Sequence, residues 1–248
     1  MATSQINAVP SAHVEAAPVT VDRDIRTHML ATYASLRRLI AVATAAFLIT
    51  LAGYRYVGHD PVHRDSISAY YYHHNGDVRM KDLFIAALSS VGLLLVAYQG
   101  YTDRENWALN TGGVALLGVV AFPMDWDLAT DSSGELTIRG GVHYTCAVTF
   151  FLSLGYVCLY RAQDTLGLIP VQAQRTYRNL YRITGFFMWT VPAVALLLRW
   201  IGYDGWVYVV EYFGVSVFLI YWIVKSVEMR VSLTETPQGL AEAEARAQ

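Results

Sequence analysis

The sequence predicts an all-α, polytopic membrane protein with six transmembrane helices and both termini in the cytoplasm. The first observation behind this prediction is a set of six apolar runs, each 18 or 19 residues long, at residues 39–57, 83–101, 107–124, 142–160, 183–200 and 207–224. An α-helix needs about 20 apolar residues to cross about 30 Å of hydrocarbon. The second is composition, because 54% of the residues are hydrophobic and only 15% are charged. The third is the unequal distribution of Lys and Arg between the two sets of span ends.

The positive residues orient the predicted bundle. Eleven Lys and Arg residues lie at the ends that share a side with the N-terminus, and six lie at the opposite ends. The larger set is Arg23, Arg26, Arg37, Arg38, Arg104, Arg161, Arg175, Arg178, Arg182, Lys225 and Arg230, and the smaller set is Arg55, Arg64, Arg79, Lys81, Arg139 and Arg199. Because cytoplasmic loops carry the excess of positive charge, the larger set is predicted to be cytoplasmic. An even number of spans also places both termini on one side, which agrees.

Aromatic residues mark the boundaries of the spans in chain order, as amphipathic rings favour the headgroup level. They are Tyr54 and Tyr56, Tyr98 and Tyr101, Trp107, Tyr160, Trp200 and Tyr208. A loop with Gly167 and Pro170 precedes the fifth span, and residues 172–182 are predicted to form a basic interfacial helix that extends it. Cys146 and Cys158 both fall in the fourth span, about 18 Å apart along a helix, which is too far for a disulfide.

The spans also set the domain organisation. Residues 1–24 lack a periodic apolar face and are predicted to be a disordered cytoplasmic tail. Residues 25–230 form the six-helix transmembrane domain, and residues 231–248, which are polar and rich in Ala and Glu, form a second cytoplasmic tail. The net charge of −2, with basic residues scattered over helix ends, argues against a nucleic-acid partner. Membrane lipid is the expected partner, and the sequence leaves an oligomer open.

The polar residues of interest fall on the side predicted to be extracytoplasmic. They come from the first outer loop, the second outer loop and the adjacent ends of the fourth and sixth spans. We predict a polar ligand-binding pocket built from Ser66, Ser68, Asp77, Asp125, His143 and Glu211. An ionisable group inside hydrocarbon is costly and normally has a partner. For Glu211 two partners stay open at this point, an ion pair with Arg199 or a shared site with His143.

Two kinds of catalytic site use the same region. His73, His143 and Asp125, or Glu211 in place of the aspartate, could hold a zinc ion whose bound water attacks a lipid. The spacing matches no compact metal motif such as HExxH. Ser66 or Ser68 with His73 and Asp77 also has the residue types of a nucleophilic triad.

A resemblance to known proteins rests on the stretch Ser66-Ile67-Ser68-Ala69-Tyr70-Tyr71 and on its continuation. The continuation comprises Asp77, residues 96–101, Asn110, Ala121-Phe122-Pro123 and His143. Over residues 66–160 the chain resembles a group of uncharacterised bacterial six-span membrane proteins of unknown function, akin to DRAM-like proteins. This resemblance implies a six-helix fold in the inner (plasma) membrane and no particular mechanism.

A second likeness, to the superfamily of alkaline ceramidases and adiponectin receptors, is incomplete. Those proteins use a Ser, an Asp and three His residues to hold zinc for lipid amide hydrolysis. The likeness rests on Ser66 or Ser68, Asp77 or Asp125, and His143. The chain departs from the superfamily in having six predicted spans where seven are expected, and Glu211-Tyr212 stands where a paired HxxxH would be.

Three functions therefore follow from the sequence, and it leaves open whether the protein is an enzyme. The leading hypothesis is a binding, sensing or accessory role for the outer-side pocket. The first alternative is a metal-dependent membrane hydrolase that acts on a lipid. The second alternative is a small-solute transporter.

Overall fold

The structure, a computed structural model, describes residues 19–56, 64–75, 78–124 and 137–232. Six long helices dominate these residues. They are α1 (Val19–Tyr56), α2 (Met80–Ala97), α3 (Asp103–Ala121), α4 (Ile138–Tyr156), α5 (Val171–Trp200) and α6 (Val207–Val231). Each of the six predicted apolar runs falls largely within one of these helices. The prediction of an all-helical fold is confirmed, with one small exception described next.

In the described parts of the connections the structure has short elements. They are the 3-10 helices η1 (Ser68–Tyr72), η4 (Ala162–Leu168) and η5 (Asp204–Trp206), a π-helical turn η3 (Val157–Arg161), and the strands β1 (His74–Asn75) and β2 (Val78–Arg79). The two strands are antiparallel, with His74 opposite Arg79 and Asn75 opposite Val78. This hairpin leads directly into α2.

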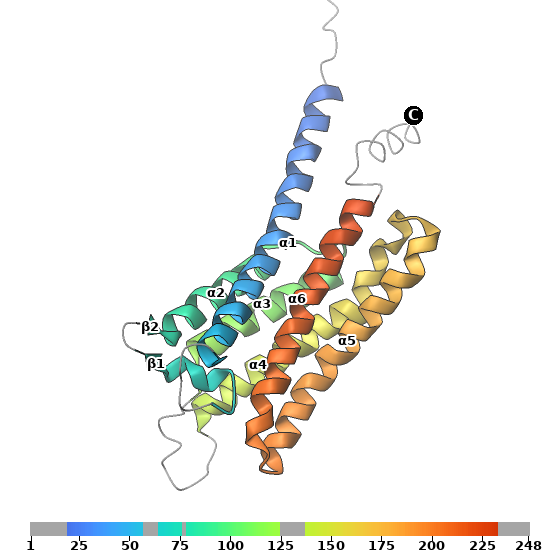
Figure 1. Ribbon diagram of the computed structural model, residues 1–248. Coiled ribbons are helices and arrows are strands. Elements are labelled where there is room, and N and C mark those ends of the chain that lie inside the picture. The colour runs from blue at the N-terminus through green and yellow to red at the C-terminus, as the bar shows by residue number, and fades with distance from the viewer. Residues whose placement is uncertain (1–18, 57–63, 76–77, 125–136, 233–248) are drawn as a thin grey trace, which may run out of the picture.

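The helices form a closed ring in which each contacts the next along the chain and α1 contacts α6. Figure 1 shows that the start of α1 and the end of α6 lie at the same end of the bundle. The core inside the ring has two clusters of buried side chains. One, at the end where η1 lies, includes Phe47, Tyr70, Phe84 and Tyr208. The larger one continues through the middle of the bundle to the opposite end.

Five of the described helices are long and apolar enough to cross a membrane. The remaining one, α3, packs between α2 and α4 as the predicted third span should. Its first turn contains Asp103, Arg104 and Glu105, and this charge lowers its mean hydropathy. The architecture is that of a multi-pass membrane protein with five or six spanning helices.

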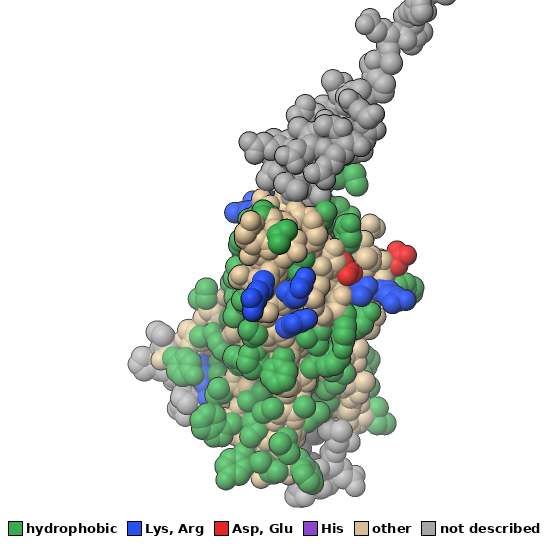
Figure 2. All heavy atoms as spheres, turned by 90° about the vertical axis from the view of Figure 1, so that its right-hand side faces the viewer, with side chains coloured by type: hydrophobic (Ala, Val, Ile, Leu, Met, Phe, Trp, Pro, Cys, Tyr) green, Lys and Arg blue, Asp and Glu red, His purple; other side chains and the backbone are tan. Residues whose placement is uncertain are grey.

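The surface of the bundle agrees with this architecture. Figure 2 shows one face on which hydrophobic side chains cover the body, while several Lys and Arg side chains gather near the end of the bundle where α1 begins and α6 ends. The change from basic to hydrophobic surface occurs within α5, which is one continuous helix of 30 residues. Arg175, Arg178 and Arg182 are exposed in its first half, and they are followed by exposed Ile183 and Phe186. The predicted basic extension of the fifth span is therefore helical and continuous with that span.

Two smaller expectations also bear on the fold. Cys146 and Cys158 are both free thiols, as their separation predicted. The helix α1 begins at Val19, inside the segment that the sequence analysis assigned to a disordered tail, so residues 19–24 are helical. Residues 1–18 and 233–248, the greater part of the two predicted tails, lie outside the described residues.

Glycine allows the close approach of α2 and α3. A Cβ atom at Gly113 would lie 2.7 Å from the backbone oxygen of Gly92, which cannot move aside as a flexible side chain can. We expect Gly113→Ala to destabilise the protein by about 1–3 kcal/mol, the usual effect of overpacking. Gly53→Ala is the matched control, because nothing lies within 4 Å of a Cβ there. Melting temperatures in detergent check this, and equal values for both variants would contradict it.

Candidate functional site

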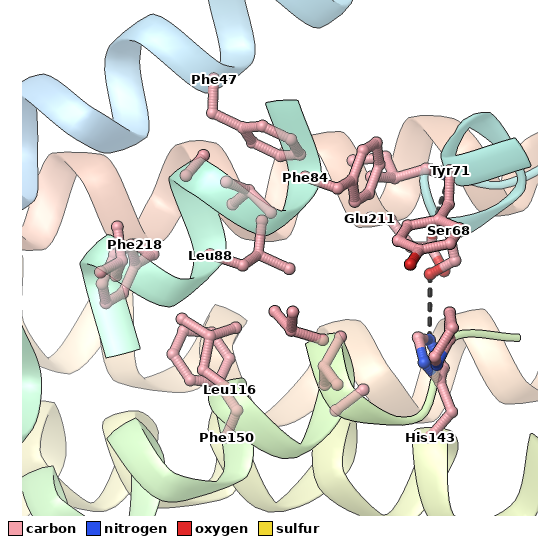
Figure 3. A pocket seen from close by; sticks show the side chains of 18 of the residues that line it. Phe47, Ser68, Tyr71, Phe84, Leu88, Leu116, His143, Phe150, Glu211 and Phe218 are labelled. Carbon is pink, nitrogen blue, oxygen red and sulfur yellow. Dashed lines mark hydrogen bonds between the residues drawn. The ribbon is translucent and has the colours of Figure 1, made fainter. Parts of the chain in front are cut away.

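A cavity of about 140 Å³ lies inside the bundle, beneath η1, and α1, α2, α3, α4 and α6 all contribute to its wall. Most of the lining is aliphatic or aromatic, and it includes Phe47, Phe84, Leu88, Leu116, Phe150 and Phe218. The polar side chains in the wall are Thr44, Ser68, Tyr71, His143 and Glu211. In Figure 3 Ser68, Tyr71, His143 and Glu211 lie toward one end of the cavity, whereas Phe218, Leu116 and Phe150 lie toward the other. The cavity is therefore amphipathic along its length.

The hydrogen bonds of His143 fix its tautomer. Its Nδ1 lies 2.9 Å from the backbone oxygen of Phe122, and its Nε2 lies 3.1 Å from Oγ of Ser68. A carbonyl oxygen can only accept, so Nδ1 carries the proton in the neutral ring. Nε2 is then the acceptor, and the Ser68 hydroxyl donates to it (Figure 3). This hydrogen bond connects η1 to α4 at the polar end of the cavity, because Ser68 belongs to η1 and His143 to α4.

The carboxyl group of Glu211 holds the chain that leads into η1. Its Oε2 accepts from the Ser66 hydroxyl at 2.9 Å and from the backbone N–H of Ile67 at 2.6 Å. The Ser66 oxygen in turn accepts from the backbone N–H of Ser68 at 3.1 Å. Glu211 is thus connected to Ser68 through two hydrogen bonds, and it fixes the position of the serine that faces His143.

Residues 64–73, here called the cap segment, close this end of the bundle. Tyr70 is its anchor, since the side chain is fully buried and packs against Tyr208 of α6. Arg55 of α1 donates to the Tyr70 hydroxyl at 2.9 Å and to the backbone oxygen of Arg64 at 2.8 Å. Its guanidinium also lies 3.8 Å from the centre of the Tyr208 ring. The backbone N–H of Tyr208 donates to the oxygen of Asp65 at 2.7 Å, which ties the cap segment to the start of α6.

The structure brings together four of the six residues that were predicted to form the pocket. Ser66, Ser68, His143 and Glu211 form one hydrogen-bonded group at the cavity end. Asp77 and Asp125 lie outside the described residues, so their part of the prediction stays untested. Of the two partners considered for Glu211, His143 belongs to the same hydrogen-bonded group, through Ser66 and Ser68. The charge of Arg199 also acts on the Glu211 carboxyl, without a direct salt bridge between these two described residues. The guanidinium of Arg199 lies 5.7 Å from the centre of the Tyr144 ring.

The predicted zinc ligands are not assembled by the residues described. His73 does not line the cavity; its Nδ1 lies 3.4 Å from Nη2 of Arg64 and its ring packs edge-on against Tyr54. Among the described residues no group of three His, Cys, Asp or Glu side chains is close enough to hold a metal ion. Zinc at His143 stays a prediction, because Asp125 is not described, and its binding through Nε2 would require Ser68 to give up its hydrogen bond.

A second buried polar group, which the sequence analysis did not identify, lies toward the opposite end of the bundle. Lys225 and Glu228, one turn apart on α6, form an ion pair at 3.0 Å with side chains only 3% and 0% exposed. Lys225 also donates to Oγ of Thr165 at 2.6 Å, and the hydroxyls of Thr165 and Tyr181 donate to Glu228. From the sequence, Lys225 was predicted to be one of the charges on the cytoplasmic side. The signal that could have revealed the group is the i, i+3 spacing of opposite charges at the end of an apolar run.

No family model, curated protein or solved structure compared with this chain matches it. Both family resemblances noted in the sequence stay predictions.

Proposed function

We propose that the protein is an inner-membrane protein of a bacterium, with both termini in the cytoplasm, that binds a small amphiphile in a pocket on the extracytoplasmic side. Binding is the step that a sensing role and an accessory role would share. The proposal names a lipid fragment or a lipid-like small molecule as the ligand. No nucleic-acid partner is part of it.

The orientation is supported by the positive-inside rule applied to the observed helix ends. Arg175, Arg178 and Arg182 are exposed at the end of the bundle where α1 begins and α6 ends. The cap segment, next to β1, lies toward the opposite end (Figure 1). Ile67, Ser68 and Tyr71 of that segment line the cavity, so the cavity lies toward the same end. With the termini in the cytoplasm, the pocket faces the outer leaflet.

One observation carries the binding proposal: the cavity is apolar over most of its length and has hydrogen-bonding groups gathered at one end. Ligand sites are typically concave and apolar, with a few polar groups that fix the orientation of the ligand. The volume of about 140 Å³ is close to the roughly 150 Å³ of an engineered apolar cavity that takes up benzene. The part of the ligand that enters is therefore a ring or a short acyl segment.

The polar end favours a ligand head that can both donate and accept. Both hydrogen bonds that described residues make to Glu211 end on Oε2, which leaves Oε1 able to accept from a ligand. The Ser68 hydroxyl donates to His143, so its oxygen can still accept. Thr44, the polar residue in the α1 part of the wall, already donates to the carbonyl of Ile40 in its own helix.

Photolabelling with a trifluoromethyl-diazirinyl benzyl alcohol tests the proposal on purified protein in lipid nanodiscs. We expect mass spectrometry to find label on residues of the cavity wall, and octanol to compete for it. Ala87→Phe should reduce this labelling by at least about tenfold, equivalent to 1.4 kcal/mol of binding free energy, because Ala87 lines the cavity and the larger ring fills it.

The matched control is the neighbouring Ala86→Phe, because Ala86 is exposed on the outer face of α2 and does not line the cavity. It should leave cavity labelling unchanged. Label confined to lipid-facing residues, or equal cavity labelling in Ala87→Phe and wild type, would refute binding in this pocket. A probe of the same size without the hydroxyl should label the wall more weakly, since it cannot bond at the polar end.

A further inference from the structure

We propose that Ser68 is a nucleophile, activated by His143, that accepts the acyl group of a neutral ester with a short apolar acyl chain or an aromatic acid. This inference rests on the proposed binding pocket and adds a reaction to it. It uses no metal ion. It also replaces the histidine that the sequence suggested as the partner of the serine, since His143 and not His73 contacts Ser68.

The first argument is the geometry of the pair. An activated serine needs a base within about 2.6–3.2 Å and a third group that orients the base. Ser68 Oγ lies 3.1 Å from Nε2 of His143, and the Phe122 carbonyl orients the ring through Nδ1 at 2.9 Å. The carbonyl keeps the proton on Nδ1, so the lone pair of Nε2 points at the serine. The ring is therefore in the tautomer that can accept the serine proton.

The second argument is the contrast between the two serines of the cap segment. Ser66 is 3% exposed and does not line the cavity, and its hydroxyl is engaged with both Glu211 and the N–H of Ser68. Ser68 lines the cavity beside His143 (Figure 3). The Ser66 bonds already hold the cap segment in place. The bond between Ser68 and His143 is not needed for that purpose, and it lies at the wall of the cavity, where a ligand can reach it.

The third argument concerns the substrate. An acyl chain that occupies the apolar part of the cavity would bring its carbonyl carbon to the polar end, where Ser68 lies. Tyr71 lies beside Ser68 in Figure 3, and its phenolic hydroxyl is a donor that can bond to the carbonyl oxygen as negative charge develops there. The small volume restricts the acyl group to a ring or a short chain, whereas the alcohol part of the ester can extend out of the cavity.

The reaction balances with water as the only co-reactant. His143 Nε2 takes the Ser68 proton while Oγ forms a bond to the ester carbonyl carbon. The bond between that carbon and the alkoxy oxygen then breaks, and the leaving alkoxide takes the proton from Nε2. An acyl ester of Ser68 and a free alcohol result. Water attacks the acyl ester in the same way, with Nε2 again taking and returning a proton, and this releases the carboxylic acid and restores Ser68.

A short-chain alkyl fluorophosphonate tests the proposal, because it phosphonylates activated serines with loss of fluoride. We expect one adduct per chain, on Ser68, in the purified wild-type protein. Ser68→Ala should abolish it. His143→Gln keeps a donor for Phe122 and an acceptor for Ser68 but has no base, so the rate should fall by about 10²–10⁴-fold, the usual contribution of general base catalysis.

Ser216→Ala is the control for a serine on the same bundle, because that hydroxyl only donates to the carbonyl of Tyr212 in its own helix. It should label as wild type. A second measurement needs no variant: p-nitrophenyl butyrate should release a burst of nitrophenolate equal to the amount of protein and leave a butyryl adduct on the Ser68 peptide.

The outcomes separate this inference from the binding proposal. An unmodified Ser68 in the wild type, or the same rate in His143→Gln, overturns the nucleophile. If the diazirine probe still labels the cavity wall in that case, the binding proposal is supported and the proposed reaction is refuted. If neither reagent reaches the cavity, both fall.

Discussion

Replacing Glu228 with leucine is expected to lower the stability of this protein by about 3–5 kcal/mol, the cost of leaving a buried charge without its partner. Lys225, with a side chain 3% exposed, would keep its hydrogen bond to Thr165 but lose the carboxylate that balances its charge. The hydroxyl of Tyr181 would lose its acceptor at the same time. Equilibrium unfolding in mixed detergent measures the change in free energy.

The double variant Lys225→Met with Glu228→Leu should recover much of the lost stability, because both charges are removed together and the side chains stay apolar and similar in size. A double-mutant cycle gives the coupling energy of the pair. Asp82→Leu is the control. It breaks the Arg79–Asp82 pair, which has the same i, i+3 spacing but side chains 71% and 60% exposed. Such pairs contribute about 0–1 kcal/mol. A Glu228→Leu variant no less stable than Asp82→Leu would contradict the prediction.

The burial of Lys225 and Glu228 could not be predicted from the sequence. An apolar run locates Lys225 near the end of a span, and that position alone is typical of a side chain that reaches the headgroups. Whether the residue faces lipid or the bundle depends on the rotation of α6 against its neighbours. In the structure Lys225 and Glu228 face the bundle, where Lys225 bonds to Thr165 of η4 and Glu228 to Tyr181 of α5. Both partners are far away in the chain. The number and positions of the helices, by contrast, follow from local hydropathy, and the structure agrees closely with them.

The sequence predicts which residues belong to the candidate site, but it does not predict which of them bond to one another. Ser66, Ser68, His143 and Glu211 are polar residues beside or inside apolar runs, and the cost of burying them predicts that they have partners. Which partner each one has depends on how the cap segment folds back over the ring. The residue types suggested a triad of Ser66 or Ser68 with His73 and Asp77, whereas in the structure Ser68 bonds to the histidine of α4.

The anchors of the cap segment were missed for a related reason. Tyr208 was grouped with the other aromatic residues at span ends, where interfacial rings are common, and Tyr70 was noted only in the stretch that carries the family resemblance. In the structure Tyr70 is fully buried and its hydroxyl accepts a hydrogen bond from Arg55. Composition gives no sign of this difference, because it arises from the packing of η1 against α1 and α6.

The second large effect is expected at Glu211. Glu211→Leu removes the acceptor of both the Ser66 hydroxyl and the Ile67 N–H, and each polar group left unpaired in a buried place costs about 1–3 kcal/mol. The loss falls on the cap segment. Relative to the wild type, we therefore expect amide hydrogen exchange to become faster in residues 64–73 and to change less in α5. An increase of at least about tenfold at Ile67 corresponds to 1.4 kcal/mol of local opening free energy.

Glu211→Gln separates the role of hydrogen bonding from that of charge. Its amide oxygen can accept from Ser66 and Ile67 as Oε2 does, so the exchange of the cap segment should stay close to that of the wild type. Ser68 should then still face His143, and fluorophosphonate labelling should persist in Glu211→Gln but fall in Glu211→Leu. Rapid exchange of the cap segment in both variants would mean that the charge of Glu211 holds the segment. Slow exchange in both would mean that Tyr70 and Arg55 hold it without help from Glu211.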